Sequence, residues 1–216
     1  MDLNLIQKII IWAIPVLFAV TMHEVAHGWV ARKLGDPTAQ MLGRLTVNPI
    51  KHVDPIGTVL VPALMLILGG FLFGWAKPVP ITARNFKNPR RDMALVALAG
   101  PLSNLAMGII WAIIIRIGVA VSLPWLSVPL VLMGQAGVLI NAILLVVNLL
   151  PLPPLDGGRV LTGLIPPRMA ATVDRVEPFG FIIIIALLVT GILNVIVAPP
   201  INALRIGLLM HIGGLG

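Results

Sequence analysis

The chain has 216 residues, of which 58% are hydrophobic and only 11% are charged. Soluble domains average roughly 45–50% apolar and about 25% charged residues. The composition therefore excludes an ordinary soluble domain and indicates an integral membrane protein. The formal net charge of +7 does not indicate nucleic-acid binding, because the aromatic residues do not alternate with the basic ones. Cysteine is absent, which excludes disulfides and thiolate metal sites.

Long apolar runs make up most of the chain. They lie at 3–31, 55–73, 93–123, 128–150 and 179–198. Each is close to or above the roughly 18–20 residues that cross a bilayer as a helix, and none alternates polar and apolar residues as an outer-membrane barrel strand does. We therefore expect an all-α integral membrane protein, a polytopic helical bundle with about four to six membrane segments. We expect one membrane-embedded domain over 1–216, whose first run is retained because it lacks the basic start and cleavage site of a signal peptide.

The basic residues are unevenly distributed among the loops. They concentrate in 32–54 and 74–92, are absent from 117–127 and reappear in 151–178. Cytoplasmic loops of membrane proteins carry an excess of Lys and Arg. If all five runs crossed the bilayer, the two most basic loops would face opposite sides. We therefore expect 55–73 to enter and return on one side, so that the first and fourth runs cross in the same direction.

An H-E-x-x-H motif, His23-Glu24-Val25-Ala26-His27, stands near the end of the first run. Residues four apart lie on the same face of a helix. Both imidazoles can therefore reach one zinc ion, while Glu24 lies beside it as a candidate general base. Ionisable residues within a membrane span are costly and usually functional. The alternative is a pair of core histidines that hydrogen bond to neighbouring backbone.

A catalytic zinc site needs a third protein ligand in addition to water, and Asp156 is the best candidate. It follows the fourth apolar run and prolines at 151, 153 and 154, which cannot continue a regular helix. Irregular backbone at membrane depth occurs where it lines a cavity. Alone, Asp156 before two glycines would be an ordinary turn residue. The other candidates are Asp92, Asp174, Glu177, His52 and His211, and we interpret the two histidines as solvated or structural.

Two further motifs accompany the H-E-x-x-H pentapeptide. One is Ala99-Gly100-Pro101-Leu102-Ser103-Asn104, and the other is the segment 148–158, which reads N-L-L-P-L-P-P-L-D-G-G. In this order the three motifs resemble the site-2 protease family of intramembrane zinc metalloproteases. The resemblance covers about residues 10–165, the expected catalytic core. No PDZ-like or CBS domain of the larger family members is found in this sequence.

The resemblance implies a role for each site residue. His23, His27 and Asp156 are expected to bind one Zn²⁺ ion, and Glu24 is expected to act as the base. Asn148 is expected to hold the substrate or the developing oxyanion, unless its amide only links two helices. We interpret Ser103 and Asn104 as packing and hydrogen-bonding residues.

The sequence therefore predicts a zinc-dependent intramembrane endopeptidase of regulated intramembrane proteolysis. We expect it to cut membrane-spanning proteins near the cytoplasmic face of a bacterial or archaeal plasma membrane. The expected partners are the lipid bilayer and a membrane-protein substrate, with no nucleic acid, and the oligomeric state is left open. The alternatives are a divalent-metal transporter and a catalytically silent membrane scaffold.

Two segments outside the motifs also carry expectations. Prolines make the segment 74–86 a short extended or β-hairpin element. Its first part, 74–82, is either a strand edge that pairs with an unwound substrate or an interfacial loop anchored by Trp75. The last apolar run, 179–198, is expected to be a C-terminal membrane segment.

Overall fold

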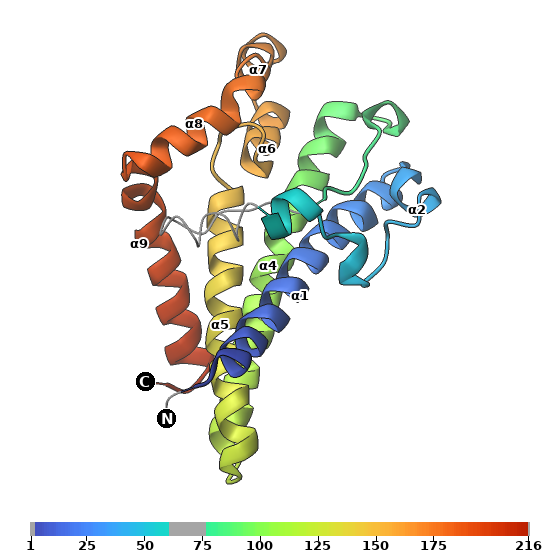
Figure 1. Ribbon diagram of the computed structural model, residues 1–216. Helices are drawn as coiled ribbons and strands as arrows, with labels where there is room; N and C mark the ends of the chain where they lie inside the picture. The colour runs from blue at the N-terminus through green and yellow to red at the C-terminus, as the bar shows by residue number, and fades with distance from the viewer. Residues whose placement is uncertain (1–2, 61–76, 216) are drawn as a thin grey trace.

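The computed structural model describes residues 3–60 and 77–215, and within these ranges the protein is helical, with no strand (Figure 1). The long helices are α1 (Leu5–Lys33), α4 (Pro89–Ala120), α5 (Pro124–Asn148) and α9 (Ile192–Gly207). The short helices are α2 (Thr38–Met41), α6 (Asp156–Leu164), α7 (Pro167–Asp174) and α8 (Glu177–Val189). Single turns of other helix types lie at Pro49–Lys51, Pro55–Leu60, Ala83–Asn85 and Leu208–Ile212. The predicted all-α architecture is confirmed.

Four of the described helices are long and apolar enough to cross a bilayer: α1, α4, α5 and the continuous stretch Ile192–Ile212. The outer faces of these helices carry exposed large apolar side chains, among them Ile6, Ile9, Phe18, Ile110 and Ile196. Such side chains face lipid in a membrane protein, whose spans must satisfy their backbone hydrogen bonds internally. The protein is therefore a multi-pass membrane protein.

The C-terminal membrane segment is not where hydropathy places it. The predicted run 179–198 is broken at Gly191, whose φ of 76° lies in the left-handed region and ends the helix there. The resulting helix α8 has 13 residues and is about 20 Å long, which is too short for a bilayer core of about 30 Å. The span begins after Gly191 instead. The run at 55–73 is described only as far as residue 60, so its predicted re-entrant path lies outside the described residues.

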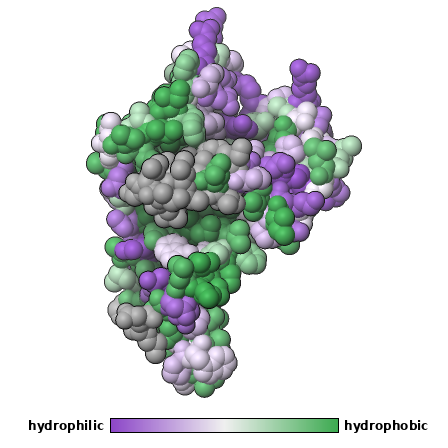
Figure 2. Space-filling model, viewed as in Figure 1, coloured by the Kyte–Doolittle hydropathy of each residue, from purple (hydrophilic) through white to green (hydrophobic). Residues whose placement is uncertain are grey.

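Helix α4 is the centre of the bundle and packs against α1, α5 and α6. Figure 1 shows α1 and α5 running in one direction and α4 in the other, so the predicted parallel arrangement of the first and fourth runs is present. The segments around α2, α6 and α7 lie at one end of the bundle, and both chain termini lie toward the opposite end. Hydrophilic residues gather at the end with α2, α6 and α7 (Figure 2).

Small residues let α4 and α5 approach closely. Gly134 and Gly137 on α5 leave space for Ile115 and Trp111 of α4, and a Cβ at either glycine would overlap those side chains. Ile115 and Trp111 are themselves buried, with Val138 in the same apolar cluster. Small-residue contacts of this kind replace the hydrophobic effect as the basis of helix association in lipid.

An extended segment, residues 77–82, lies against α1 and against the loop that follows it; we call this segment the strap. Asp36, just beyond the end of α1, fixes one end of it. The Asp36 carboxylate accepts hydrogen bonds from the Thr82 amide at 2.7 Å and from the Asn85 side-chain amide at 2.7 Å. It also accepts from the Thr38 amide and hydroxyl. Phe86, buried with Ala31 and Val96, completes the attachment.

These donors keep Asp36 ionised. Burial raises the pKa of the carboxyl, but the hydrogen bonds from Thr38, Thr82 and Asn85 outweigh it and lower the pKa below its ordinary value. Because the folded-state pKa is depressed, the contribution to stability is present above the unfolded pKa of about 3.9. It is lost as the pH falls from there through the folded-state pKa.

We predict that Asp36→Asn lowers stability at pH 7 by about 2 kcal/mol, because one acceptor oxygen becomes an amide that faces hydrogen-bond donors. The difference in stability between the wild-type protein and the variant should become smaller as the pH falls below about 4. Thermal unfolding midpoints in detergent at pH 7 and pH 3 measure both effects. Asp174→Asn, on the exposed end of α7, is the charge-matched control; an equal gap at both pH values would contradict the assignment.

Candidate metal centre

Helix α1 places His23 and His27 on the same face, one turn apart. Both side chains are buried, and their Nε2 atoms are 3.0 Å apart. The ring planes are nearly perpendicular, at 87°. The helical spacing predicted from H-E-x-x-H is therefore present.

Gly100 on α4 makes room for the two rings. A Cβ built at this position would overlap both His27 and His23. The close approach of α4 to α1 thus requires a residue without a side chain. The motif 99–104 contributes to the site by this packing as well as by its hydrogen bonds.

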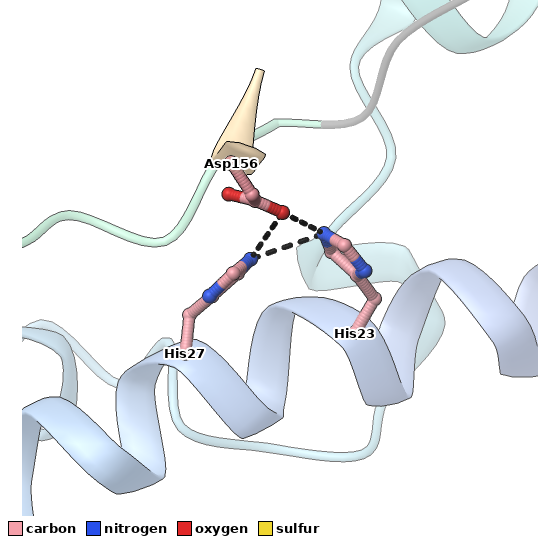
Figure 3. A group of neighbouring side chains, drawn as sticks. All are labelled: His23, His27 and Asp156. Atoms are coloured by element: carbon pink, nitrogen blue, oxygen red, sulfur yellow. Dashed lines mark hydrogen bonds and ion pairs between the residues drawn. The ribbon is translucent and has the colours of Figure 1, made fainter. Parts of the chain in front are cut away.

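Asp156 reaches the histidines from the other side of the site (Figure 3). It is the first residue of α6 and follows the irregular, proline-containing turn after α5. Its Oδ2 lies 3.2 Å from Nε2 of His23 and 3.4 Å from Nε2 of His27. Gly157 allows α6 to start here, because a Cβ at that position would overlap the carbonyl groups of Leu149 and Leu150.

The opposite ring nitrogens fix the protonation of both histidines. Nδ1 of His23 lies 2.7 Å from Oδ1 of Asn104, and Nδ1 of His27 lies 2.7 Å from the Val96 carbonyl oxygen. Both partners are acceptors, so each neutral ring carries its proton on Nδ1 and presents a lone pair at Nε2. Metal-ligating histidines are commonly oriented in this way by their second nitrogen.

With this tautomer in both neutral rings, the lone pairs of His23, His27 and Asp156 meet at one buried point with no proton between them. Among the described residues, Oδ2 of Asp156 is buried with no hydrogen-bond donor. The potential ligand atoms of His23, His27 and Asp156 all lie within 4.8 Å of one another. A cation removes the repulsion among these atoms, and two imidazoles with one carboxylate are a donor set that suits zinc. The residues fit a metal ion.

A cavity of about 190 Å³ opens beside this group. Glu24 and Asn148 line it together with the three potential ligands, so all five residues singled out in the sequence meet here. The Glu24 carboxylate accepts a hydrogen bond of 2.7 Å from the Val79 amide of the strap. The side-chain amide of Asn148 donates to the Leu144 carbonyl oxygen at 2.9 Å, which leaves its second N–H and its oxygen for other partners.

The part of the site that sequence reasoning missed is the support of His23. Asn104 is fully buried and, besides accepting from His23, donates to the Ala19 carbonyl oxygen at 3.2 Å and to Oδ1 of Asn141 at 3.0 Å. Asn141 in turn donates to the Gly137 carbonyl oxygen. Asn104 does hydrogen bond, as expected, but its partner is a potential ligand. The signal in the sequence that could have indicated this support was the presence of two asparagines, Asn104 and Asn141, within apolar helices.

The other candidate ligands lie elsewhere. His52 is buried, and its Nε2 donates to the Thr46 carbonyl oxygen at 2.8 Å, which is a structural role. His211 is exposed near the C-terminus. Asp92 accepts from the Asn88 amide at the start of α4. Glu177 lies 3.9 Å from Arg159.

Comparison with known proteins identifies relatives along most of the chain. The model of "Peptidase family M50" matches residues 127–191. The chain is 42% identical over 195 residues to "Putative zinc metalloprotease YwhC" of Bacillus subtilis, which covers 89% of this chain and 86% of that protein. Two proteins of the same description named Rip2 are 29% identical over 180 residues (Mycolicibacterium smegmatis) and 30% over 182 residues (Mycobacterium tuberculosis). Each alignment covers 82% of this chain and 66% of Rip2. No solved structure matches.

We predict that Asn104→Ala weakens zinc binding about 10- to 100-fold, because the His23 ring loses the acceptor that fixes its proton and orientation. Competition with a chromophoric chelator measures the affinity. Ser103→Ala is the matched control, since that hydroxyl bonds only to Gly100 within its own helix among the described contacts. Wild-type affinity in a folded Asn104→Ala protein would show that the hydrogen bond does not support the metal centre.

Proposed function

We infer the function of this chain from its family and its site: the chain belongs to peptidase family M50, the site-2 proteases, and is a multi-pass membrane protein and a zinc metalloprotease. We propose that it hydrolyses peptide bonds of membrane-spanning proteins close to the cytoplasmic face of the membrane. We further propose that one zinc ion is held by His23, His27 and Asp156. The observation that supports the proposal is the convergence of three buried lone pairs beside a cavity that Glu24 also lines.

Bound zinc supplies a Lewis acid that polarises the scissile carbonyl and makes a coordinated water acidic. Glu24 accepts the proton of the attacking water and delivers it to the leaving amine. His23 and His27 keep their protons on Nδ1 throughout, because Asn104 and Val96 accept them there. Asp156 contributes the negative charge of the ligand set.

Asn148 is positioned to act on the substrate. It ends α5, lines the cavity, and has one amide N–H engaged by Leu144. The second N–H can donate to the oxygen that becomes negative as the peptide bond is attacked, and such a donor typically accelerates the step by about 10²–10³-fold. We propose this role in place of a purely structural link between helices.

The cytoplasmic side is assigned by charge. The end of the bundle that carries α2, α6 and α7 contains the basic loops around Arg44, Arg84, Arg159 and Arg168, whereas the α4–α5 turn at the other end has no charged residue between 117 and 127. Because cytoplasmic loops carry an excess of Lys and Arg, the positive-inside tendency supports a cytoplasmic location for the basic end. The site lies near this end, where water can enter. We further propose that the host membrane is a bacterial or archaeal plasma membrane; a relative that is 42% identical to this chain comes from the bacterium Bacillus subtilis.

The strap limits how a substrate strand could pair with it. Pro78 and Pro80 have no amide N–H, and the amides of Val79 and Thr82 already donate to Glu24 and Asp36. Pairing of the kind predicted for 74–82 would therefore have to use the Ile81 amide or carbonyl oxygens of the strap. Trp75 and the start of that segment lie outside the described residues.

The two alternative functions fit the site less well. A metal transporter needs ligands along a path, whereas the described residues contain one group that could hold a metal, and transport gives no role to Glu24. A catalytically silent membrane scaffold would need neither a catalytic base nor three potential metal ligands that meet at one point.

We predict that Glu24→Gln retains zinc and lowers cleavage of a reconstituted membrane-protein substrate by about 10²–10⁴-fold, because the proton acceptor is lost. Asp156→Ala should lose both zinc and cleavage, since two histidines alone hold the ion weakly. Metal analysis of the purified proteins and a proteoliposome assay separate the two outcomes. Glu177→Gln and Asp174→Ala are the matched controls, and normal cleavage by Glu24→Gln would refute the mechanism.

A second prediction concerns sidedness. A reporter fused after Ile165, between α6 and α7, should read as cytoplasmic, and one fused after Val121, between α4 and α5, should read as external. Paired enzymatic and fluorescent reporters at the two positions measure this. The same side for both would contradict the four-span arrangement, and reversed sides would place the site near the external face.

A further inference from the structure

The strap touches the proposed base directly. The backbone N–H of Val79 donates to Oε2 of Glu24 at 2.7 Å, although the two residues are 55 positions apart in sequence. In Figure 3 the extended segment that follows the grey trace passes close to Asp156. A charged acceptor makes such a bond stronger than one between neutral groups.

Both ends of the strap are held in place. At one end Arg44 donates to the carbonyl oxygens of Lys77 at 2.9 Å and Pro78 at 3.4 Å, and the Lys77 amide donates to the His52 carbonyl oxygen at 3.0 Å. At the other end the Thr82 amide is held by Asp36. The middle of the strap is therefore fixed relative to α1 by contacts on either side of Val79.

Packing of the Val79 side chain against α1 fixes the distance between the strap and this helix. It is buried and packs over Gly28, one residue beyond the H-E-x-x-H motif. A Cβ at Gly28 would lie 3.1 Å from a Val79 methyl, 3.2 Å from Leu45 and 3.3 Å from the Ala39 methyl. The absence of a side chain at Gly28 thus leaves the space that Val79 fills.

The flanking prolines make the strap stiff and leave Val79 as its central donor. Pro78 and Pro80 restrict the backbone to extended conformations. They also cannot donate, so in the stretch 78–80 the Val79 amide is the single N–H. A rigid chain that presents one amide to one carboxylate orients that carboxylate.

We propose that the strap is a positioning element for the catalytic base: the Val79 amide holds Oε2 of Glu24 so that Oε1 faces the cavity and the attacking water. This inference rests on the proposed role of Glu24. The bond spares one oxygen for catalysis and prevents the side chain from rotating between productive and unproductive orientations. Misplacement of a catalytic group by about 1 Å costs about 100-fold in rate, so the effect falls on kcat.

The test removes the amide hydrogen of residue 79 and controls separately for the loss of the Val79 side chain. Val79→Pro deletes the N–H in a segment that is already extended, whereas Val79→Ala keeps the N–H and deletes two methyl groups. We expect Val79→Pro to lower kcat about 10- to 100-fold with KM and zinc content near wild type, and Val79→Ala to lose much less. Equal losses in both variants, or a higher kcat for Val79→Pro, would overturn the proposal.

Hydrogen exchange provides a readout that does not depend on activity. In the metal-free protein, Glu24→Ala should speed exchange of the Val79 amide at least tenfold, while Glu24→Gln, which keeps a carbonyl acceptor, should speed it much less. The Thr82 amide, held by Asp36, serves as the internal control. Unchanged Val79 exchange in Glu24→Ala would show that the bond does not form in solution.

A third pair of variants tests the anchoring away from the site. Arg44→Gln weakens the bonds to Lys77 and Pro78, and Lys51→Gln removes the same charge from an exposed position on the same loop. We expect a lower kcat for Arg44→Gln alone. Normal cleavage by Glu24→Gln would overturn the proposed function itself. An inactive Glu24→Gln together with a fully active Val79→Pro would overturn only the role of the strap.

Discussion

The structure depends on the meeting of three unprotonated ligand atoms at one buried point. Two neutral imidazoles and a carboxylate repel one another there unless a cation is bound, so the surrounding fold must hold them together against that repulsion. It does so through the far side of each histidine: Asn104 and the Val96 carbonyl oxygen, both on α4, take the Nδ1 protons. Helix α4 therefore sets the protonation of the two potential ligands that belong to α1. This explains why α4 lies at the centre of the bundle and why it carries a glycine, Gly100, where the rings pass over it.

The same constraint accounts for the course of the chain. Asp156 can reach the histidines only if its helix starts at their depth, and this requires α5 to end there after running in the same direction as α1. A regular helix would carry the chain past the site, so the backbone breaks between α5 and α6 at a cluster of prolines. The carbonyl groups of Leu149 and Leu150 at this break lie against Gly157, where a side chain would overlap them. Irregular backbone at this depth is tolerated because it lines the cavity and is covered by protein.

The sequence was sufficient to predict features that depend on residues close together in the chain. It was insufficient for features that depend on contacts between distant segments. H-E-x-x-H and the aspartate after the proline cluster identified the potential ligands, since each pattern is local and costly in an apolar setting. Hydropathy located three spans well but misplaced the last, because a single left-handed glycine at 191 divides a uniformly apolar run. The function of Asn104 could not be separated from ordinary helix packing, because only the fold shows that its neighbour is His23. The contact of Val79 with Glu24 was equally hidden, since a backbone amide carries no signature in the sequence.

These contacts divide the support of the site between two parts of the molecule. The proposed metal ligands are held by helices α1 and α4 and by the start of α6, whereas the proposed base is held by the strap, which is attached through Asp36 and Arg44 outside the spans. In this proposal, metal binding and proton transfer depend on different sets of interactions. A change at the strap can alter the orientation of Glu24 without disturbing the bonds that Asn104 and Val96 make to the histidines. Because Asp36 and Arg44, which attach the strap, lie beyond the end of α1, contacts outside the membrane-spanning helices can change the orientation of the proposed base, while the proposed metal ligands are surrounded by those helices.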